Sequence, residues 1–208
     1  MKKRIVQVFH NLIGKEALPD ISASGHNSDP KMREDTAETD SRADSGGIDS
    51  DIVPADVRMV DWKAFERIVT KSLSGGRTQG CLLLCNVDRC RDINNIYGRD
   101  AGDAVLRYVA KVLCDVFGEN VCMGSPGGDG FALWLPVASK DNADDIRRQV
   151  GVVNDRLLHP AGELPPATVS VGAACAGHGE DYKSLAKRAG KALFTVKGSG
   201  RCGCEILL

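Results

Sequence analysis

The sequence predicts an α+β fold with a central antiparallel sheet that is flanked by helices. Three observations lead to this prediction. The stretches CLLLCNV and ATVSVGAAC are largely apolar, which is typical of strands that are covered on both faces. Stretches with apolar residues at helical spacing separate these strands from one another. The segment GGDG lies between two short apolar runs, a pattern that favours a β-hairpin.

The first half of this fold is expected to begin with a helix. Asp61 can cap this helix, whose apolar face consists of Trp62, Phe65, Ile68, Val69 and Leu73. The strand Cys81–Val87 comes next, followed by a helical stretch over residues 89–97. A longer helix then presents an apolar face made of Val105, Val109, Val112, Leu113 and Val116. A short strand near Val121 and a strand over residues 131–135 form the hairpin.

The second half is expected to begin with a helix that Ser139 caps and that carries Ile146, Val150, Val153 and Leu157. Residues 167–175 form another central strand, and residues 204–208 form the closing strand. The helix between them carries Tyr182, Leu185, Ala189, Leu193 and Val196. The order is therefore helix, β-α-β-β-α-β, helix and strand. Its middle part predicts a ferredoxin-like palm built from split βαβ units.

The composition limits the classes of function. With 208 residues, of which 42% are hydrophobic, the chain has room for one ordinary domain and a tail. Its 27 basic and 28 acidic residues leave a net charge of -1, which argues against a nucleic-acid partner bound through bulk electrostatics. The sequence has no run of about 18 apolar residues, the length that a transmembrane helix needs.

The eight cysteines bear on redox state and metal binding. None forms a CxxC pair, so the spacing of a cysteine metal site is absent. Cys81 and Cys85 lie in an apolar run, and Cys114 and Cys175 lie among residues typical of a core. We therefore expect buried free thiols in a reducing cytoplasm.

The chain is expected to divide into three regions. Residues 1–13 begin with basic residues and continue with apolar residues at helical spacing. This pattern fits a short amphipathic helix that contacts a membrane surface or a partner, and it fits a stray helical turn equally well. Residues 14–55 are polar and acidic without periodicity, which predicts a disordered linker. Residues 56–208 hold the folded domain.

Polar residues are expected to gather where the first central strand ends. In a split βαβ palm this strand lies beside the hairpin, so Asn86, Asp88 and Asp129 should meet in one corner. Carboxylates on neighbouring strand ends can hold Mg²⁺, which takes oxygen ligands and binds phosphates. Glycines at the tip let backbone N–H groups approach a triphosphate. By itself, GGDG is more simply explained as a hairpin turn.

Longer motifs add to this pattern. The segment NVDRCRDINNIYGRDAGDAVL resembles the signature D-x-D-x-F-K-x-I-N-D-x-x-G-H-x-x-G-D-x-x-L of GGDEF domains, the diguanylate cyclases. GGDGF is similar to their GG[DE]EF hairpin, TVSVGAA to a later strand, and LAKRAGKALFTVKGSGRCG to their closing helix. The resemblance covers residues 64–203. It implies the palm of the nucleotidyl cyclases and a part in bacterial cyclic di-GMP signalling.

The resemblance also implies roles for single residues. Members of the family join two GTP molecules into cyclic di-GMP. The positions that bind the substrate correspond here to Asn94, Asp103, Gly127, Gly128, Lys197 and Arg201. The positions that hold Mg²⁺ correspond to Asn86, Val87 and Asp129. Asp88 lies two residues beyond Asn86, hence on the same strand face, and offers a further carboxylate for the metal.

The sequence departs from the family pattern where catalysis takes place. Gly130 stands in place of the catalytic Glu, and Asn86 in place of the first metal-binding Asp. Ser125 stands where the family commonly has an Arg. Losing an acid/base group typically costs about 10²–10⁴-fold in rate. We therefore expect a degenerate member of the family that is inactive or weak, and we assign no catalytic residue.

Three functions stay open at this point. The first is a regulatory module that binds GTP or a related guanine nucleotide without efficient synthesis of cyclic di-GMP. The second is a weakly active cyclase that works through Asp129 and Asp88 and needs a homodimer to bring two sites together. The third is a protein-interaction module with a vestigial pocket, because each matching residue also suits a helix end or a turn. The expected location is the cytoplasm, with residues 1–13 as the segment for contact with a membrane surface.

Overall fold

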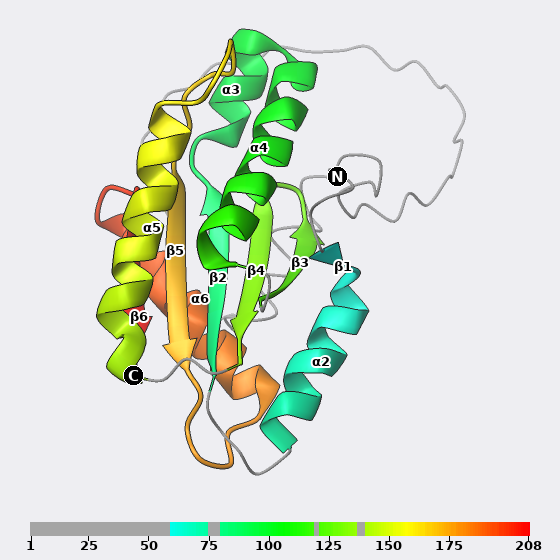
Figure 1. Ribbon diagram of the computed structural model, residues 1–208, viewed down its shortest axis with the longest axis vertical. Coiled ribbons are helices and arrows are strands. Elements are labelled where there is room, and N and C mark those ends of the chain that lie inside the picture. Colours follow the sequence, from blue (N-terminus) through cyan, green and yellow to red (C-terminus); the bar gives the residue numbers. More distant parts are fainter. Residues whose placement is uncertain (1–58, 75–79, 119–120, 137–139) are drawn as a thin grey trace, which may run out of the picture.

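A computed structural model describes residues 59–74, 80–118, 121–136 and 140–208. Its strands are β1 (Met59–Val60), β2 (Cys81–Val87), β3 (Cys122–Gly127), β4 (Gly130–Leu135), β5 (Val169–Cys175) and β6 (Gly203–Leu207). Its helices are α2 (Trp62–Ser74), α3 (Cys90–Tyr97), α4 (Arg99–Phe117), α5 (Ala143–Leu158) and α6 (Tyr182–Gly198), with a short 3₁₀ helix η2 (Lys140–Asn142) before α5. Figure 1 shows the strands as one sheet between the helices.

The six strands are arranged in the order β1-β3-β4-β2-β5-β6. The four central strands β3, β4, β2 and β5 run antiparallel to one another, as a ferredoxin-like palm requires. The edge strands β1 and β6 run parallel to β3 and β5, so the complete sheet is mixed. The predicted α+β palm is therefore confirmed. Strand β1 was not predicted, because two residues carry no periodicity.

Alternation along β2 divides the core into two layers. Cys81, Leu83, Cys85 and Val87 face the layer that α3, α4 and α5 cover. Leu82 and Leu84 face the layer that α2 and α6 cover. In Figure 1, α4 and α5 accordingly cross in front of the sheet and α6 runs behind it. Asn86, which follows Leu84 in the alternation, belongs to the face of α6, and this placement directs it toward the candidate site.

The remaining elements agree with the sequence predictions with one exception in α2. The Asp61 carboxylate accepts a hydrogen bond of 2.9 Å from the backbone N–H of Ala64, as expected of an N-cap. Ile68, predicted on the buried face, is 38% exposed, because the buried stripe is limited to Phe65, Val69 and Leu73. The predicted segments 1–13 and 14–55 and the predicted cap Ser139 lie outside the described residues.

Helix α6 lies directly on strand β5 at Gly172. A Cβ atom at this position would meet the backbone of Leu193 and the carbonyl oxygen of Ala189. Gly172 therefore permits a close approach that no other residue allows. This contact fixes how far α6 stands from the sheet, and with it the reach of side chains at the end of α6.

The prediction of free thiols was wrong for one pair. Cys81 and Cys175 lie directly opposite each other on β2 and β5, with their Cα atoms 4.0 Å apart, and they form a disulfide. They are separated by 94 positions in the sequence, so only the register of the sheet reveals the pair. The other six cysteines lie outside this disulfide, and of these only Cys202 is exposed.

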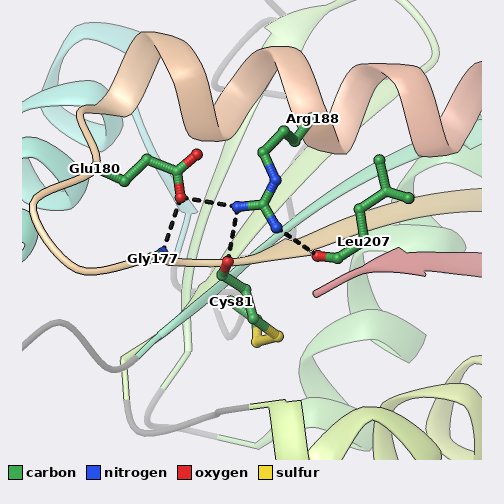
Figure 2. Close-up of a disulfide and its surroundings, with 6 residues drawn as sticks. Cys81, Gly177, Glu180, Arg188 and Leu207 are labelled. Atoms are coloured by element: carbon green, nitrogen blue, oxygen red, sulfur yellow. Dashed lines mark hydrogen bonds and ion pairs between the residues drawn. A yellow bond between two sulfur atoms is a disulfide. The ribbon is translucent and has the colours of Figure 1, made fainter.

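An ion pair reinforces the same end of the sheet. Figure 2 shows Arg188 beside the disulfide, between Glu180 and the strands. The Arg188 guanidinium donates to the Glu180 carboxylate at 2.8 Å and to the backbone carbonyls of Cys175 and Leu207 at 3.0 Å each. Because its contacts lie on the loop before α6, on β5 and on β6, this residue joins three segments.

The described helices also bear on membrane insertion. None of them combines the length and the apolar character that crossing a bilayer requires.

Candidate functional site

The end of β2 and the tip of the β3–β4 hairpin meet as the sequence predicts. Asn86 lies directly opposite Gly130 in the antiparallel pair of β2 and β4. The backbone N–H of Val87 donates to the carbonyl oxygen of Asp129 at 2.9 Å. The Asn86 side-chain amide donates to the Asp129 carboxylate at 2.7 Å. Backbone and side-chain contacts thus hold Asp129 against the end of β2.

The hairpin turn depends on its two glycines and on Ser125. Gly127 and Gly128 have φ angles of 108° and 67°, a region that favours glycine. The Ser125 hydroxyl donates to the carbonyl oxygen of Gly130 at 2.8 Å and accepts from the N–H of Gly127 at 3.0 Å. Ser125 is buried, so these bonds are shielded from water. The serine therefore closes the turn from inside, a role that the sequence did not indicate.

Lys197 reaches the same corner from the last turn of α6. Its ammonium donates to the Asn86 side-chain oxygen at 2.8 Å, which completes a chain from Lys197 through Asn86 to Asp129. The Lys197 side chain is half-buried. Burial lowers the pKa of its ammonium, while the nearby Asp129 and Asp88 carboxylates act in the opposite direction. The cation is therefore placed among acidic groups within the protein and not in bulk water.

Asp88 has a different environment from Asp129. One carboxylate oxygen accepts from the Ser170 hydroxyl at 2.7 Å. The other accepts from the Thr168 hydroxyl at 2.8 Å and from the backbone N–H of Cys202 at 3.1 Å. Asp88 is only 6% exposed. It joins the end of β2 to the start of β5 and to the loop after α6, so its contacts are those of a residue that positions its surroundings.

The loop after α6 carries the second basic residue of the site. Arg201 and Cys202 have φ angles of 70° and 53°, which residues other than glycine seldom adopt. The N–H of Arg201 donates to the carbonyl oxygen of Val196 at 3.0 Å, and Asp88 accepts from the next residue. The Arg201 side chain is exposed. These backbone bonds hold the strained loop in place and leave the guanidinium open to solvent.

Asn94 and Asp103, two of the residues matched to substrate binding, lie on neighbouring helices. Asn94 is on α3, and Asp103 is on the first turns of α4. The Asn94 side chain lies over Gly102, where a Cβ atom would meet its amide oxygen. Asn94 is exposed and Asp103 half-buried, and neither side chain forms a hydrogen bond with another described residue. Their polar groups therefore stay open to a ligand.

Cys90 connects the two halves of the site. Burial raises the pKa of its thiol to about 11, with the Asp129 and Asp103 carboxylates contributing in the same direction. Its thiol thus lies within the electrostatic reach of one carboxylate from the hairpin and one from α4. The protonated thiol is a small, nearly apolar group.

Carboxylates are few in this corner. Gly130 has no side chain at the position to which the sequence resemblance assigns a catalytic acid. Within the described residues, no group of three or more His, Cys, Asp or Glu side chains is placed to hold a metal ion. The arrangement offers two cations, one open carboxylate on the hairpin and one on α4. Such a set can bind an anion next to a group that donates hydrogen bonds.

The geometry sorts the predicted site residues into groups. Asn86, Asp129 and Lys197 are joined by hydrogen bonds, and Gly127 and Gly128 form the turn above them. Val87 contributes backbone only, since its side chain lies in the core. The residues that sequence reasoning missed are Ser125, Thr168, Ser170 and Cys202. Of these, Ser125 was named only as a departure from the family pattern, and Ser170 is the serine of the strand segment TVSVGAA.

Comparison with known proteins places these features in a family. Residues 58–202 match the family model described as diguanylate cyclase, GGDEF domain. The diguanylate cyclase DosC of Escherichia coli K12 is 31% identical over 129 residues, which cover 60% of this chain and 28% of DosC. The diguanylate cyclase DgcM of the same strain is 33% identical over 120 residues, covering 58% of this chain and 29% of DgcM. This chain thus spans less than a third of the length of these two relatives.

Solved structures agree with the sequence relatives. The GGDEF domain of DgcB from Caulobacter crescentus, determined in complex with c-di-GMP, has a TM-score of 0.65 at 25% identity. The match covers 80% of this chain and 98% of that domain. The active GGEEF domain of a diguanylate cyclase from Vibrio cholerae has a TM-score of 0.64 at 20% identity, covering 71% of this chain and 97% of that one. At that identity the second similarity concerns the fold alone.

Proposed function

Because this chain belongs to the GGDEF family of diguanylate cyclases, we propose that it binds GTP or a related guanine nucleotide as a signalling module without efficiently making cyclic di-GMP. The observation that carries this proposal is the pair of Asn86 and Gly130, which lie opposite each other on β2 and β4. An acid belongs at both places in an active member of the family. Residues suited to binding a nucleotide lie around this pair. The pair itself lacks the carboxylates that catalysis would use.

Base recognition is the first support for nucleotide binding. The carboxylate of Asp103 can accept hydrogen bonds from N1–H and the amino group of guanine, and the Asn94 amide can pair with the base as well. Adenine lacks this pair of donors and would leave the half-buried carboxylate unpaired, at a cost of about 1–3 kcal/mol. This difference corresponds to a preference for GTP over ATP of about 5- to 150-fold.

Charge is the second support. Lys197 and Arg201 bring two cations to the mouth of the hairpin, where the triphosphate of a bound nucleotide would lie. The glycine turn adds backbone N–H groups without a side chain in the way. Each charge-assisted hydrogen bond to a phosphate contributes more than a neutral one, and salt weakens it at exposed sites.

A weakly active cyclase is the second candidate, and the contacts of Asp88 argue against it. This reading needs Asp88 to compensate for the missing acid, but both of its oxygens already accept hydrogen bonds. It also needs two copies of the chain to bring two GTP molecules together, whereas binding one nucleotide needs a single copy. Members of this family use Mg²⁺, and we propose that this site holds it weakly at most, because the Asn86 oxygen accepts from Lys197 and the Asn86 nitrogen faces Asp129.

An interaction module with a vestigial pocket is the third candidate. The exposed Ile96 and Tyr97 at the end of α3 favour it, since large apolar side chains on a surface suit contact with a protein partner. These residues are close in sequence to Asn94, so a partner and a nucleotide would share this side of the domain.

The test is calorimetric titration of the full chain with GTP and ATP, followed by chromatography of the GTP mixture. We expect GTP to bind more tightly, and no cyclic di-GMP above the level of a control without protein. Asp103→Ala should bring the two affinities together. Asp100→Ala, an exposed acid one turn earlier in α4, should leave the preference unchanged.

Each opposing outcome selects one of the other candidates. Turnover in the range usual for enzymes, about 1–10³ per second, would establish the cyclase reading. Failure of both nucleotides to bind at millimolar concentration would leave the interaction module. A preference for GTP that survives Asp103→Ala would move base recognition to other residues.

A further inference from the structure

The hydrogen bonds around Asn86 determine which atoms point where. Lys197 Nζ can only donate and lies 2.8 Å from one terminal atom of the Asn86 amide. The Asp129 carboxylate can only accept and lies 2.7 Å from the other. The amide oxygen therefore faces the ammonium and the amide nitrogen faces the carboxylate. Asparagine is suited to this place because it links a cation to an anion with one donor and one acceptor.

This arrangement does not fit a divalent cation. Mg²⁺ needs oxygen ligands at near-octahedral geometry and usually more than one carboxylate or phosphate. The Asn86 oxygen is taken by Lys197, and its nitrogen is no ligand for Mg²⁺. Asp88, the other acid in reach, is bonded through both oxygens to Ser170, Thr168 and Cys202. Asp129 is then the carboxylate among these residues with an oxygen left for a ligand, and the Lys197 ammonium, which Asn86 links to it, opposes a second cation there.

We propose that the Lys197 ammonium takes the place of the divalent cation in this chain, so that the site binds the phosphates of a guanine nucleotide without a metal. This inference rests on the proposed function. An ammonium has three N–H donors, and Asn86 accepts from one of them. The other two can donate to phosphate oxygens, and Arg201 on the following loop adds a second cation.

The same contacts explain why Asn86 and Lys197 act together. An aspartate at position 86 would present two oxygens, one of them toward Asp129 at a distance where two carboxylates repel each other. A cation would then have to lie between them. Asn86→Asp, combined with removal of the ammonium by Lys197→Met, therefore recreates the conditions for a divalent cation. This double variant should therefore bind a divalent cation, which the natural chain should not.

Two measurements on the full chain test the inference. Calorimetric titration with GTP in EDTA and in excess Mg²⁺ should give affinities for the natural chain that agree within about threefold. Lys197→Met should weaken binding in EDTA about 10- to 100-fold, the value of one charge-assisted hydrogen bond. Lys187→Met, an exposed lysine earlier on α6, is the matched control and should change neither affinity. Circular dichroism establishes that each variant is folded.

The second measurement needs no nucleotide. Electron paramagnetic resonance of Mn²⁺ should detect no bound ion with the natural chain, and bound ion with the Asn86→Asp/Lys197→Met variant. Mn²⁺ bound to the natural chain, or GTP binding that requires Mg²⁺, would overturn the inference and leave the proposed function intact. GTP binding in neither buffer would overturn the proposed function, and the inference with it.

Discussion

The two ends of strand β2 are joined to β5 by different chemistry. At the first residue of the strand, Cys81 forms a disulfide with Cys175, and Arg188 adds bonds to β5 and β6. Just past the last residue, Asp88 accepts hydrogen bonds from Thr168 and Ser170. One end is closed by a covalent bond and an ion pair, and the other by a buried carboxylate.

The two ends of β2 differ in whether their charged side chains remain available to a ligand. At the disulfide end, Arg188 donates to a carboxylate and to two carbonyl groups, so this cation is used within the fold. At the other end, beside the candidate site, the Asp88 carboxylate accepts hydrogen bonds through both oxygens. Lys197, Arg201 and Asp103 keep donors or acceptors that no described residue occupies. The structure therefore separates groups that hold the fold from groups that can hold a ligand. Substitutions at the two ends should separate stability from binding in the same way.

The largest expected effect on stability comes from the disulfide. Cys81→Ala/Cys175→Ala should lower the free energy of unfolding by about 4 kcal/mol, because the bridge closes a loop of 94 residues in the unfolded chain. Affinity for GTP should change little, since the bridge is at the far end of β2. Denaturant unfolding and calorimetry measure the two quantities. Reducing agent should lower the stability of the natural chain and leave the variant unchanged.

Thiol counting checks the same bridge independently. The denatured chain should expose six reactive thiols without reductant, from the cysteines outside the disulfide, and eight after reduction. In the native chain, Cys202 should react first because it is exposed, and Cys90 slowly because burial raises its pKa to about 11. Eight thiols in the denatured chain before reduction would show that the disulfide is absent.

A smaller loss of stability, together with a loss of binding, is expected at the site end. Asp88→Ala removes three hydrogen bonds to a buried carboxylate and leaves Thr168, Ser170 and the Cys202 N–H without their acceptor. We expect unfolding to become easier by about 3 kcal/mol. GTP affinity should fall as well, because Asp88 holds the loop that carries Arg201.

Asp144→Ala is the control for this substitution. Asp144 is an acid on α5 whose ion pair with Arg147 is exposed to solvent, so its loss should cost less than about 1 kcal/mol and leave GTP binding unchanged. Equal stabilities of the Asp88 and Asp144 variants would contradict the positioning role of Asp88. A lower stability with unchanged affinity would limit that role to the fold.

The same two ends show how far the sequence predicts this molecule. Strand Cys81–Val87 was predicted at its observed bounds, because a continuous apolar run is the signal of a strand buried on both faces. The meeting of Asn86 with Asp129 was also predicted, since a split βαβ order puts the first strand beside the hairpin. Residues 94 and 103 were named through the spacing of the GGDEF signature, and the structure places them on the neighbouring helices α3 and α4.

Contacts that depend on register were not predictable from one sequence. The disulfide joins residues 94 positions apart, and Asp88 joins residues about 80 positions away, so each contact needs the alignment of two distant strands. Ile68 has helical spacing and is nevertheless exposed, because packing and not periodicity decides the width of the buried stripe. The bonds of Ser125 were missed for a related reason: they arise from an irregular pairing between β3 and β4.

The smallest expected effect is at this serine, and it tests whether the hairpin belongs to the fold or to the site. Ser125→Ala removes the hydroxyl that bonds to Gly130 O and Gly127 N, leaving both backbone groups without that partner in a buried position. We expect a loss of about 1 kcal/mol in the free energy of unfolding. Because the hydroxyl holds the turn over Asp129, the affinity for GTP should fall by a few-fold, about the factor that 1 kcal/mol represents.

Ser184→Ala, a substitution of an exposed serine at the start of α6, is the control for the change of residue type. Unchanged GTP affinity in a less stable Ser125 variant would assign the serine to the fold alone. A loss of affinity at unchanged stability would show that the turn is held for its ligand.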